Sequence, residues 1–125
     1  MKSIHQRILD MAAPYLGTRR NDVHVREALQ LVGRLLEEVD ADEDIVIPAI
    51  ILHDVGWIMV PEELQLTAVG PAARDRELRR VHEVEGARIA RTILTEVAYA
   101  KDKLEEIVQI VDGHDSRVEA ISLND

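Results

Sequence analysis

The strongest constraint on the fold is an almost wholly apolar segment with a histidine and an aspartate at its middle. From Ile45 to Val60 the sequence reads IVIPAIILHDVGWIMV, in which His53 and Asp54 are the only strongly polar side chains. A segment this apolar is buried on folding, and a buried carboxylate is costly unless it is paired, hydrogen-bonded or bound to a metal ion. Because imidazole and carboxylate are both good ligands for a divalent cation, the pair indicates a metal site.

The composition favours one domain with an aliphatic core. The chain has 125 residues, no Phe, one Trp and two Tyr. Its length suits a single domain, and aliphatic side chains suit close packing of helices. The sequence contains no Cys, which excludes disulfides and thiolate metal ligands and favours a reducing cytoplasm.

The formal net charge of −9 opposes binding to nucleic acid or to an anionic membrane. No basic-then-apolar signal peptide opens the chain, and the apolar segment around His53 is shorter than the roughly 20 residues that span a bilayer. We therefore expect a cytoplasmic protein with no nucleic-acid and no membrane partner, and we leave a homo-oligomer open.

Apolar residues recur at helical spacing along most of the chain, and this pattern predicts an all-α, single-domain bundle of five to six helices. The expected helices cover residues 3–13, 21–40, 44–54, 73–98 and 102–113.

Three residues are expected to shape the ends of these helices. Asn21 can cap the second helix, Pro48 is expected in the first turn or so of the third, and Gly56 suits a left-handed conformation after it. Residues 55–71 form the one long connection, either a lid or a segment with a short helical turn from Pro61.

Outside the apolar segment, the candidate metal ligands are histidines. By helical spacing His24 flanks the apolar face of its helix, His82 lies on that of the fourth, and His114 ends that of the fifth. We expect these three and His53 to point inward, and His5 to be a surface residue. Taken singly, each histidine has a simpler explanation as a solvated or hydrogen-bonded side chain. Together they suit one or two cations of Mn, Fe, Ni, Co or Zn rather than calcium.

Four short motifs occur in an order that resembles the HD-domain superfamily of metal-dependent phosphohydrolases. They read HVREAL at His24, IILHDVG at His53-Asp54, VHEVEGA at His82 and IVDGHDS at His114. The family pattern is an early His, a His-Asp doublet and a later Asp, and two-metal members add histidines between the doublet and the last Asp. The resemblance spans roughly residues 20–125.

The resemblance implies an HD-type helical fold and one or two divalent ions, with Mg added to the candidate metals. It implies that His24, His53 and Asp54 hold one metal, with Asp54 also a catalytic proton acceptor. By the same resemblance His82 and His114 match histidines that bind a second metal or a substrate phosphate. Asp115 either supports His114 or is a plain surface carboxylate.

The last Asp of the family pattern has no clear counterpart here. In the family it follows the segment of His114, early in a further helix, whereas this chain stops at Asp125. We expect the natural gene product to continue past Asp125 into a helix that starts within residues 116–125 and carries this Asp. The domain of residues 1–125 is then expected to lack its C-terminal helices.

Two further features have alternative interpretations. Arg79 and Arg80 precede His82 and either pair with neighbouring acidic residues or reach the phosphate of a substrate. Trp57, next to the doublet, is either a core anchor or a stacking surface for a substrate base.

The leading functional hypothesis is hydrolysis of a phosphate ester or phosphoanhydride by metal-activated water. The expected partner is a small phosphorylated substrate, with a nucleotide as the first candidate on the resemblance alone. Two alternatives keep the fold: a di-iron oxygenase, and a non-catalytic HD module that binds a nucleotide or a partner protein.

Overall fold

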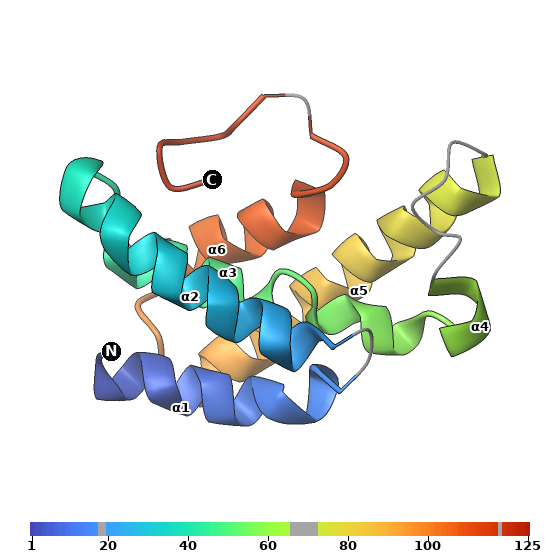
Figure 1. The fold of residues 1–125 in the computed structure, drawn as a ribbon, viewed down its shortest axis with the longest axis horizontal. Helices are drawn as coiled ribbons and strands as arrows, with labels where there is room; N and C mark the ends of the chain where they lie inside the picture. Colours follow the sequence, from blue (N-terminus) through green and yellow to red (C-terminus); the bar gives the residue numbers. More distant parts are fainter. Residues whose placement is uncertain (18–19, 66–72, 118) are drawn as a thin grey trace.

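The computed structural model describes residues 1–17, 20–65, 73–117 and 119–125, and its regular structure there is helical throughout (Figure 1). The longer helices are α1 (Ser3–Ala12), α2 (Asn21–Glu38), α3 (Glu43–Leu52), α5 (Ala73–Glu96) and α6 (Lys101–Gly113). Short turns join them: η1 (Ala13–Tyr15), η2 (Val55–Met59) and α4 (Glu62–Gln65). The predicted all-α fold and the five predicted helices are confirmed.

The core forms around α3, which packs against α1, α2 and α6, while α5 packs against α6 and η2. In Figure 1, α2 passes in front of α3. Fully buried aliphatic side chains come from most of these elements: Ile8, Ile51, Leu52, Val55, Ala90, Leu94, Ile107 and Val111. Burying one such large side chain contributes about 1.5–3 kcal/mol. Because α3 is apolar on several sides, the residues that follow its last turn emerge inside the protein.

The sequence predicted that Pro48 lies in the first turn or so of its helix. It lies instead in the second turn of α3. A proline there lacks the amide that would bond to the carbonyl of Asp44, four residues earlier. The hydroxyl of Tyr99 donates to that carbonyl at 2.5 Å, so its hydrogen-bonding capacity is used. The start of α3 is capped by Asp42, whose side chain accepts the amide of Asp44 at 2.9 Å.

Two glycines allow η2 and α5 to approach closely. A Cβ on Gly56 would lie 1.8 Å from the carbonyl oxygen of His82, and one on Gly86 would lie 3.4 Å from the amide nitrogen of Gly56. The backbones of η2 and α5 therefore lie in direct contact at these two glycines. The left-handed conformation expected at Gly56 is wrong, because none of the described glycines has a positive φ. Only glycine fits at position 56, because the backbone of α5 occupies the space that a side chain would need.

Other helix ends differ from the sequence expectation in detail. Asn21 is the first helical residue of α2 rather than its cap, and Arg20 before it has a left-handed φ of 57°. The short helical turn expected from Pro61 is confirmed as α4, whereas residues 66–72 of that connection, with the predicted lid, lie outside the described residues. No described helix is both long and apolar enough to cross a membrane.

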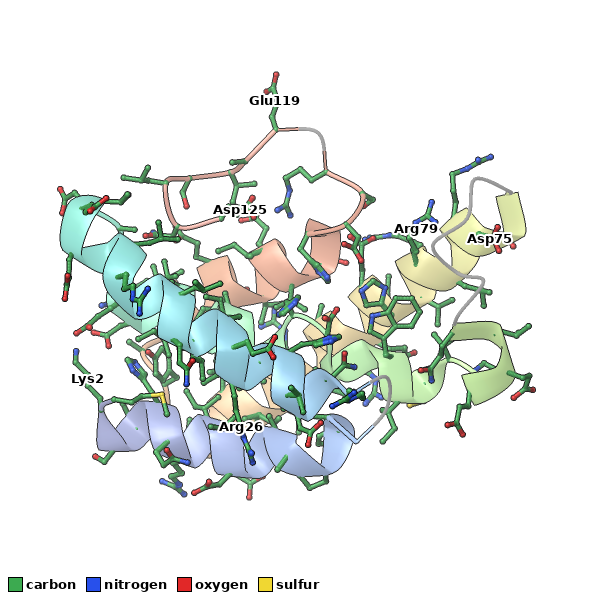
Figure 2. The ribbon with its side chains drawn as sticks, in the orientation of Figure 1. Lys2, Arg26, Asp75, Arg79, Glu119 and Asp125 are labelled. Atoms are coloured by element: carbon green, nitrogen blue, oxygen red, sulfur yellow. The ribbon has the colours of Figure 1, made fainter. Side chains whose placement is uncertain are left out.

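The described residues after α6 form turns and bends instead of the helix expected to start within residues 116–125. The carboxylate of Asp125 accepts hydrogen bonds from the Arg117 guanidinium at 2.6 Å and from the backbone of Ile121 at 2.9 Å. These bonds favour a compact turn over an extended helix. Figure 2 shows Glu119 pointing away from the helices and Asp125 lying between this segment and α6.

Candidate metal centre

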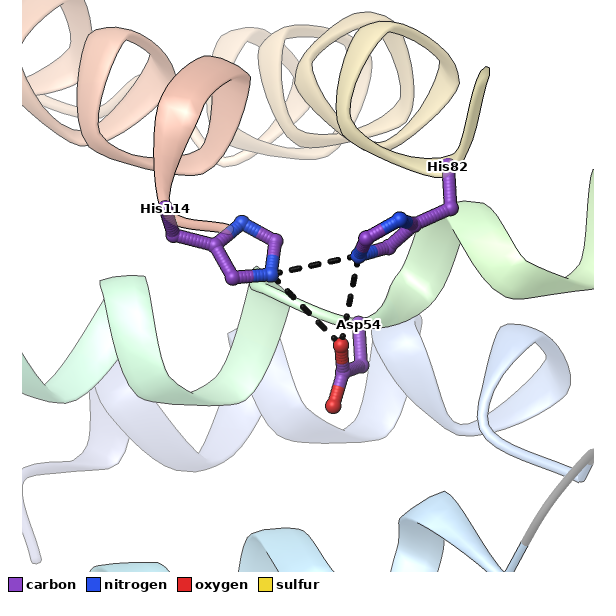
Figure 3. A group of neighbouring side chains, drawn as sticks. All are labelled: Asp54, His82 and His114. Atoms are coloured by element: carbon purple, nitrogen blue, oxygen red, sulfur yellow. Dashed lines mark hydrogen bonds and ion pairs between the residues drawn. The ribbon is translucent and has the colours of Figure 1, made fainter. Parts of the chain in front are cut away.

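Three side chains from three separate elements meet in the interior (Figure 3). Asp54 comes from the turn after α3, His82 from α5 and His114 from the end of α6. Asp54 Oδ1 lies 3.6 Å from the Nε2 atom of each histidine, and the two Nε2 atoms lie 3.2 Å apart. One ligand atom from each residue lies within 4.8 Å of the others, so the three could hold a metal ion.

The histidines around this point share one local arrangement. The Nδ1 atom of each lies beside the carbonyl oxygen three residues earlier: 2.6 Å for His53 and Ile50, 2.5 Å for His82 and Arg79, and 2.8 Å for His114 and Val111. A carbonyl only accepts, so Nδ1 must carry the proton and Nε2 presents its lone pair when the ring is neutral. Hydrogen bonds of this kind orient metal-binding histidines in proteins.

The approach of His82 to His114 requires a positive charge between the two rings, carried by a proton or by a metal ion. Two neutral rings with protonated Nδ1 atoms would point lone pairs at each other across 3.2 Å. Such an arrangement is repulsive unless a proton or a metal ion lies between the nitrogens, and the carboxylate of Asp54 supplies negative charge at the same place. A set of imidazole nitrogens and carboxylate oxygens suits first-row transition metals and zinc.

His53 lies at the outer edge of this group. Its Nε2 atom is 3.0 Å from Asp54 Oδ2, and its ring meets that of His114 edge-on with centroids 5.3 Å apart. The side chain is 31% exposed, whereas His82 is fully buried. The structure therefore brings together four of the five predicted metal ligands, with His53 on the open side.

Trp57 contacts two members of the group. Its indole Nε1 donates to Asp54 Oδ1 at 3.1 Å, and its ring stacks on His82 with centroids 4.1 Å apart and planes 14° from parallel. Only 2% of the residue is exposed, so the core-anchor interpretation is confirmed. Because both partners belong to the group, Trp57 also fixes their orientation.

Asp115 had two possible roles in the sequence analysis, and Glu83 had none. Asp115 Oδ2 lies 3.0 Å from His82 Nε2 and 3.5 Å from His114 Nε2, so this carboxylate faces the centre. Glu83 is fully buried, and its Oε2 accepts from the amides of Asp115 and Ser116 and from the Ser116 hydroxyl, at 2.9, 3.0 and 3.2 Å. The signal for Glu83 in the sequence was its place one helical turn before Ala87 and two before Ala90, small residues that suit a packed helix face.

The charges of the centre depend strongly on one another. Burial raises the pKa of Asp54, but contacts with His114, His53 and His82 outweigh it and hold that pKa far below its usual range. Burial lowers the pKa of His82, but Asp115 and Asp54 together raise it to about 9. Burial lowers the pKa of His53, but Asp54 outweighs it and the pKa is raised. The pKa of Asp115 is lowered, mainly by His82. Without a cation, a proton on His82 offsets part of the negative charge of the two carboxylates.

Two histidines are placed differently from expectation. His24 is exposed and lies outside the group, because α2 buries Asn21, Val25 and Val32, and its inward placement is therefore wrong. His5, expected on the surface, is fully buried on the face of α1 that packs against α3, and its Nε2 lies 2.9 Å from Asp44 Oδ1.

The two candidate phosphate-binding arginines differ in their surroundings. Arg80 pairs with Asp112 at 3.0 Å and with Glu83 at 3.3 Å, and so links α5 to α6. Pairing with acidic residues, one of the two interpretations of the sequence, therefore holds for Arg80. Arg79 is half-buried, and its carbonyl lies beside His82. A role for either arginine in binding phosphate stays a prediction.

A groove of about 580 Å³ adjoins the centre. His53 and His114 line it together with apolar residues of α2, α3 and α6, among them Val32, Val46, Ala49 and Ile110. Its size falls in the range of small-molecule sites, and it has the centre at one side.

A protein-family model described as HD domain matches residues 21–124, a range that includes every residue of the centre. Searches of curated proteins and of solved structures gave no match.

Proposed function

The chain belongs to the HD domain family, and on that premise we propose that it is a metal-dependent hydrolase of phosphate esters or phosphoanhydrides. The observation that supports this most is the 3.2 Å approach of the Nε2 atoms of His82 and His114, whose Nδ1 protons are both directed elsewhere. A divalent cation between these nitrogens and Asp54 would satisfy all three side chains at once.

Asp54, His82 and His114 would hold this cation, with His53 beside them. When bound, a divalent cation acidifies a water molecule and neutralises charge on phosphoryl oxygens. Asp54 Oδ2, which lies 3.0 Å from His53 Nε2, would accept the proton that the attacking water loses. That proton then passes to the oxygen that leaves phosphorus, so the ester gives an alcohol and inorganic phosphate. Trp57 keeps Asp54 in place through the bond from its indole nitrogen.

The substrate is proposed to be a small phosphorylated molecule, with a nucleotide as the first candidate. The groove beside His53 and His114 offers room for its organic part. Because the walls are largely apolar, a useful substrate screen includes nucleotides, sugar phosphates and alkyl phosphates side by side.

The test combines metal analysis with a phosphate-release screen. Protein purified without chelator is expected to contain one or two divalent ions per chain, and to release phosphate when supplied with Mn, Co, Ni or Mg. His82→Ala should lose both properties, whereas Glu96→Ala, exposed at the far end of α5, should lose neither. Bound iron with oxygen uptake and no phosphate release would favour the oxygenase, and absence of any bound metal would favour the non-catalytic module.

One further variant compares two ligand sets. The set implied by the family resemblance includes His24, whereas the group formed by Asp54, His82 and His114 does not. Metal retained in His24→Ala supports the second set, and metal lost from this variant supports the first.

A further inference from the structure

We propose that Asp115 is a fourth side chain of the metal centre and that Glu83 is the residue that positions it there. This inference rests on the proposed function, because it requires that the centre binds a cation. Asp115 immediately follows His114 and precedes Ser116, in the turn after α6.

The distances from Asp115 to the two histidines suit ligands of a shared cation. A cation with ligand distances of about 2.0–2.2 Å holds adjacent ligand atoms about 3.0–3.5 Å apart in tetrahedral or octahedral geometry. Asp115 Oδ2 lies 3.0 Å from His82 Nε2 and 3.5 Å from His114 Nε2. These separations resemble the 3.2 and 3.6 Å among the other three ligand atoms. Asp115 therefore lies within reach of a cation held by the two histidines, beside the group of three whose ligand atoms all lie within 4.8 Å of one another.

Charge favours the same assignment. Asp54 alone would balance half of a divalent charge, and a second carboxylate would balance the rest. Asp115 is 39% exposed on its side chain, so it lies where the centre opens, while His82 is fully buried behind it. A carboxylate at the open side can bind the cation and still exchange with solvent or substrate.

Glu83 explains why Asp115 stays in this position. The backbone of Asp115 is beyond the last turn of α6, so no helix holds it. Instead, Glu83 Oε2 accepts hydrogen bonds from the backbone amides of Asp115 and Ser116 and from the Ser116 hydroxyl. Glu83 Oε1 accepts a hydrogen bond from the Arg80 guanidinium. A fully buried carboxylate persists only with such partners. Since Glu83 directly follows His82 on α5, one helical segment positions an imidazole and, through the turn, a carboxylate.

The experiment measures Mn²⁺ affinity by calorimetry and the visible absorption of the Co²⁺-loaded protein. Asp115→Asn is expected to weaken Mn²⁺ binding by about tenfold or more and to change the Co²⁺ bands. Glu83→Gln is expected to weaken binding as well, and Glu83→Gln in the Asp115→Asn background should add nothing further, because Glu83 acts through Asp115. The matched controls Glu85→Gln, on the same helix, and Glu119→Gln, on the exposed turn, should leave affinity and spectrum unchanged.

Ser116→Ala removes one donor to Glu83 without altering the buried carboxylate. It is expected to weaken Mn²⁺ binding less than Asp115→Asn does. If Glu83→Gln does not fold, Ser116→Ala tests the positioning role of Glu83 in its place. Unchanged affinity and Co²⁺ bands in Asp115→Asn would overturn the assignment of Asp115. Additive losses in the double variant would overturn the positioning role of Glu83. If the unaltered protein binds no divalent ion, the proposed function fails and this inference fails with it.

Discussion

At the scale of single residues, His82 determines how the centre responds to pH. Its Nδ1 atom lies beside the Arg79 carbonyl, and its buried Nε2 atom faces Asp54, His114 and Asp115. The carboxylates raise its pKa to about 9 although burial opposes this. In the metal-free protein a proton therefore occupies the atom that a cation would need.

We expect metal binding to weaken as the pH falls below about 9, the pKa of His82 in the metal-free protein. Below this pKa a cation must displace a proton, which lowers apparent affinity by up to about tenfold per pH unit. Calorimetry with Mn²⁺ at pH 7, 8 and 9, in buffers of different ionisation enthalpy, would measure both affinity and protons released. Affinity that does not change with pH, without proton release, would contradict the direct binding of His82.

At the scale of secondary-structure elements, the close contact between η2 and α5 sets the distance between Asp54 and His82. Gly56 lies against the carbonyl of His82, where a Cβ would be 1.8 Å away. Backbone atoms cannot give way as a flexible side chain can. The two elements must therefore separate if this glycine is enlarged.

Gly56→Ala is expected to destabilise the protein by about 1–3 kcal/mol and to weaken metal binding, because overpacking moves His82 away from Asp54. Gly33→Ala is the matched control, since a Cβ there meets nothing within 4 Å. In the middle of α2 this control should stabilise the protein by about 0.5–1 kcal/mol. Urea unfolding of both variants measures the difference, and equal stabilities would show that the contact is not as tight as described.

Tyr99 completes α3 where Pro48 interrupts its hydrogen bonding. Tyr99→Phe leaves the carbonyl of Asp44 without this donor and should cost about 1–3 kcal/mol in the free energy of unfolding. Pro48→Ala restores an amide that can donate to the same carbonyl. The cost of Tyr99→Phe should therefore shrink in the Pro48→Ala background, and an equal cost in both backgrounds would show that the hydroxyl acts elsewhere.

At the scale of the whole molecule, the centre connects elements that are distant in the sequence. Its ligand atoms come from the turn after α3, from α5 and from the end of α6, so a bound cation would link three parts of the fold. The unfolded chain has no such arrangement. Metal binding is therefore expected to stabilise the folded state by mass action.

Mn²⁺ or Ni²⁺ at one hundred times its dissociation constant should stabilise the protein by about 2.7 kcal/mol. For a chain of this length the melting temperature should rise on the order of 10 °C. Differential scanning calorimetry with metal and with EDTA measures the shift, and His82→Ala should show none. Equal melting temperatures for the unaltered protein in both conditions would argue for the non-catalytic module.

Local regularities in the sequence were sufficient for the helices and for much of the centre. Spacing of apolar residues predicted each long helix to within a few residues, because helical periodicity is a property of neighbours along the chain. The apolar context of His53 and Asp54 predicted a polar group within the core, and the faces of α5 and α6 pointed to His82 and His114. These predictions needed only the positions of residues on their own helices.

The rotation of each helix about its axis was decided only by the tertiary structure. His24 and His5 both border apolar faces, yet His24 is exposed and His5 is buried. Periodicity indicates which residues share a face, but the packing partner decides which edge of that face is covered. Glu83 and the turn at Asp115 are 32 residues apart and meet because α5 packs against α6. A contact between distant segments has no signal in local spacing, since it depends on how the whole chain packs.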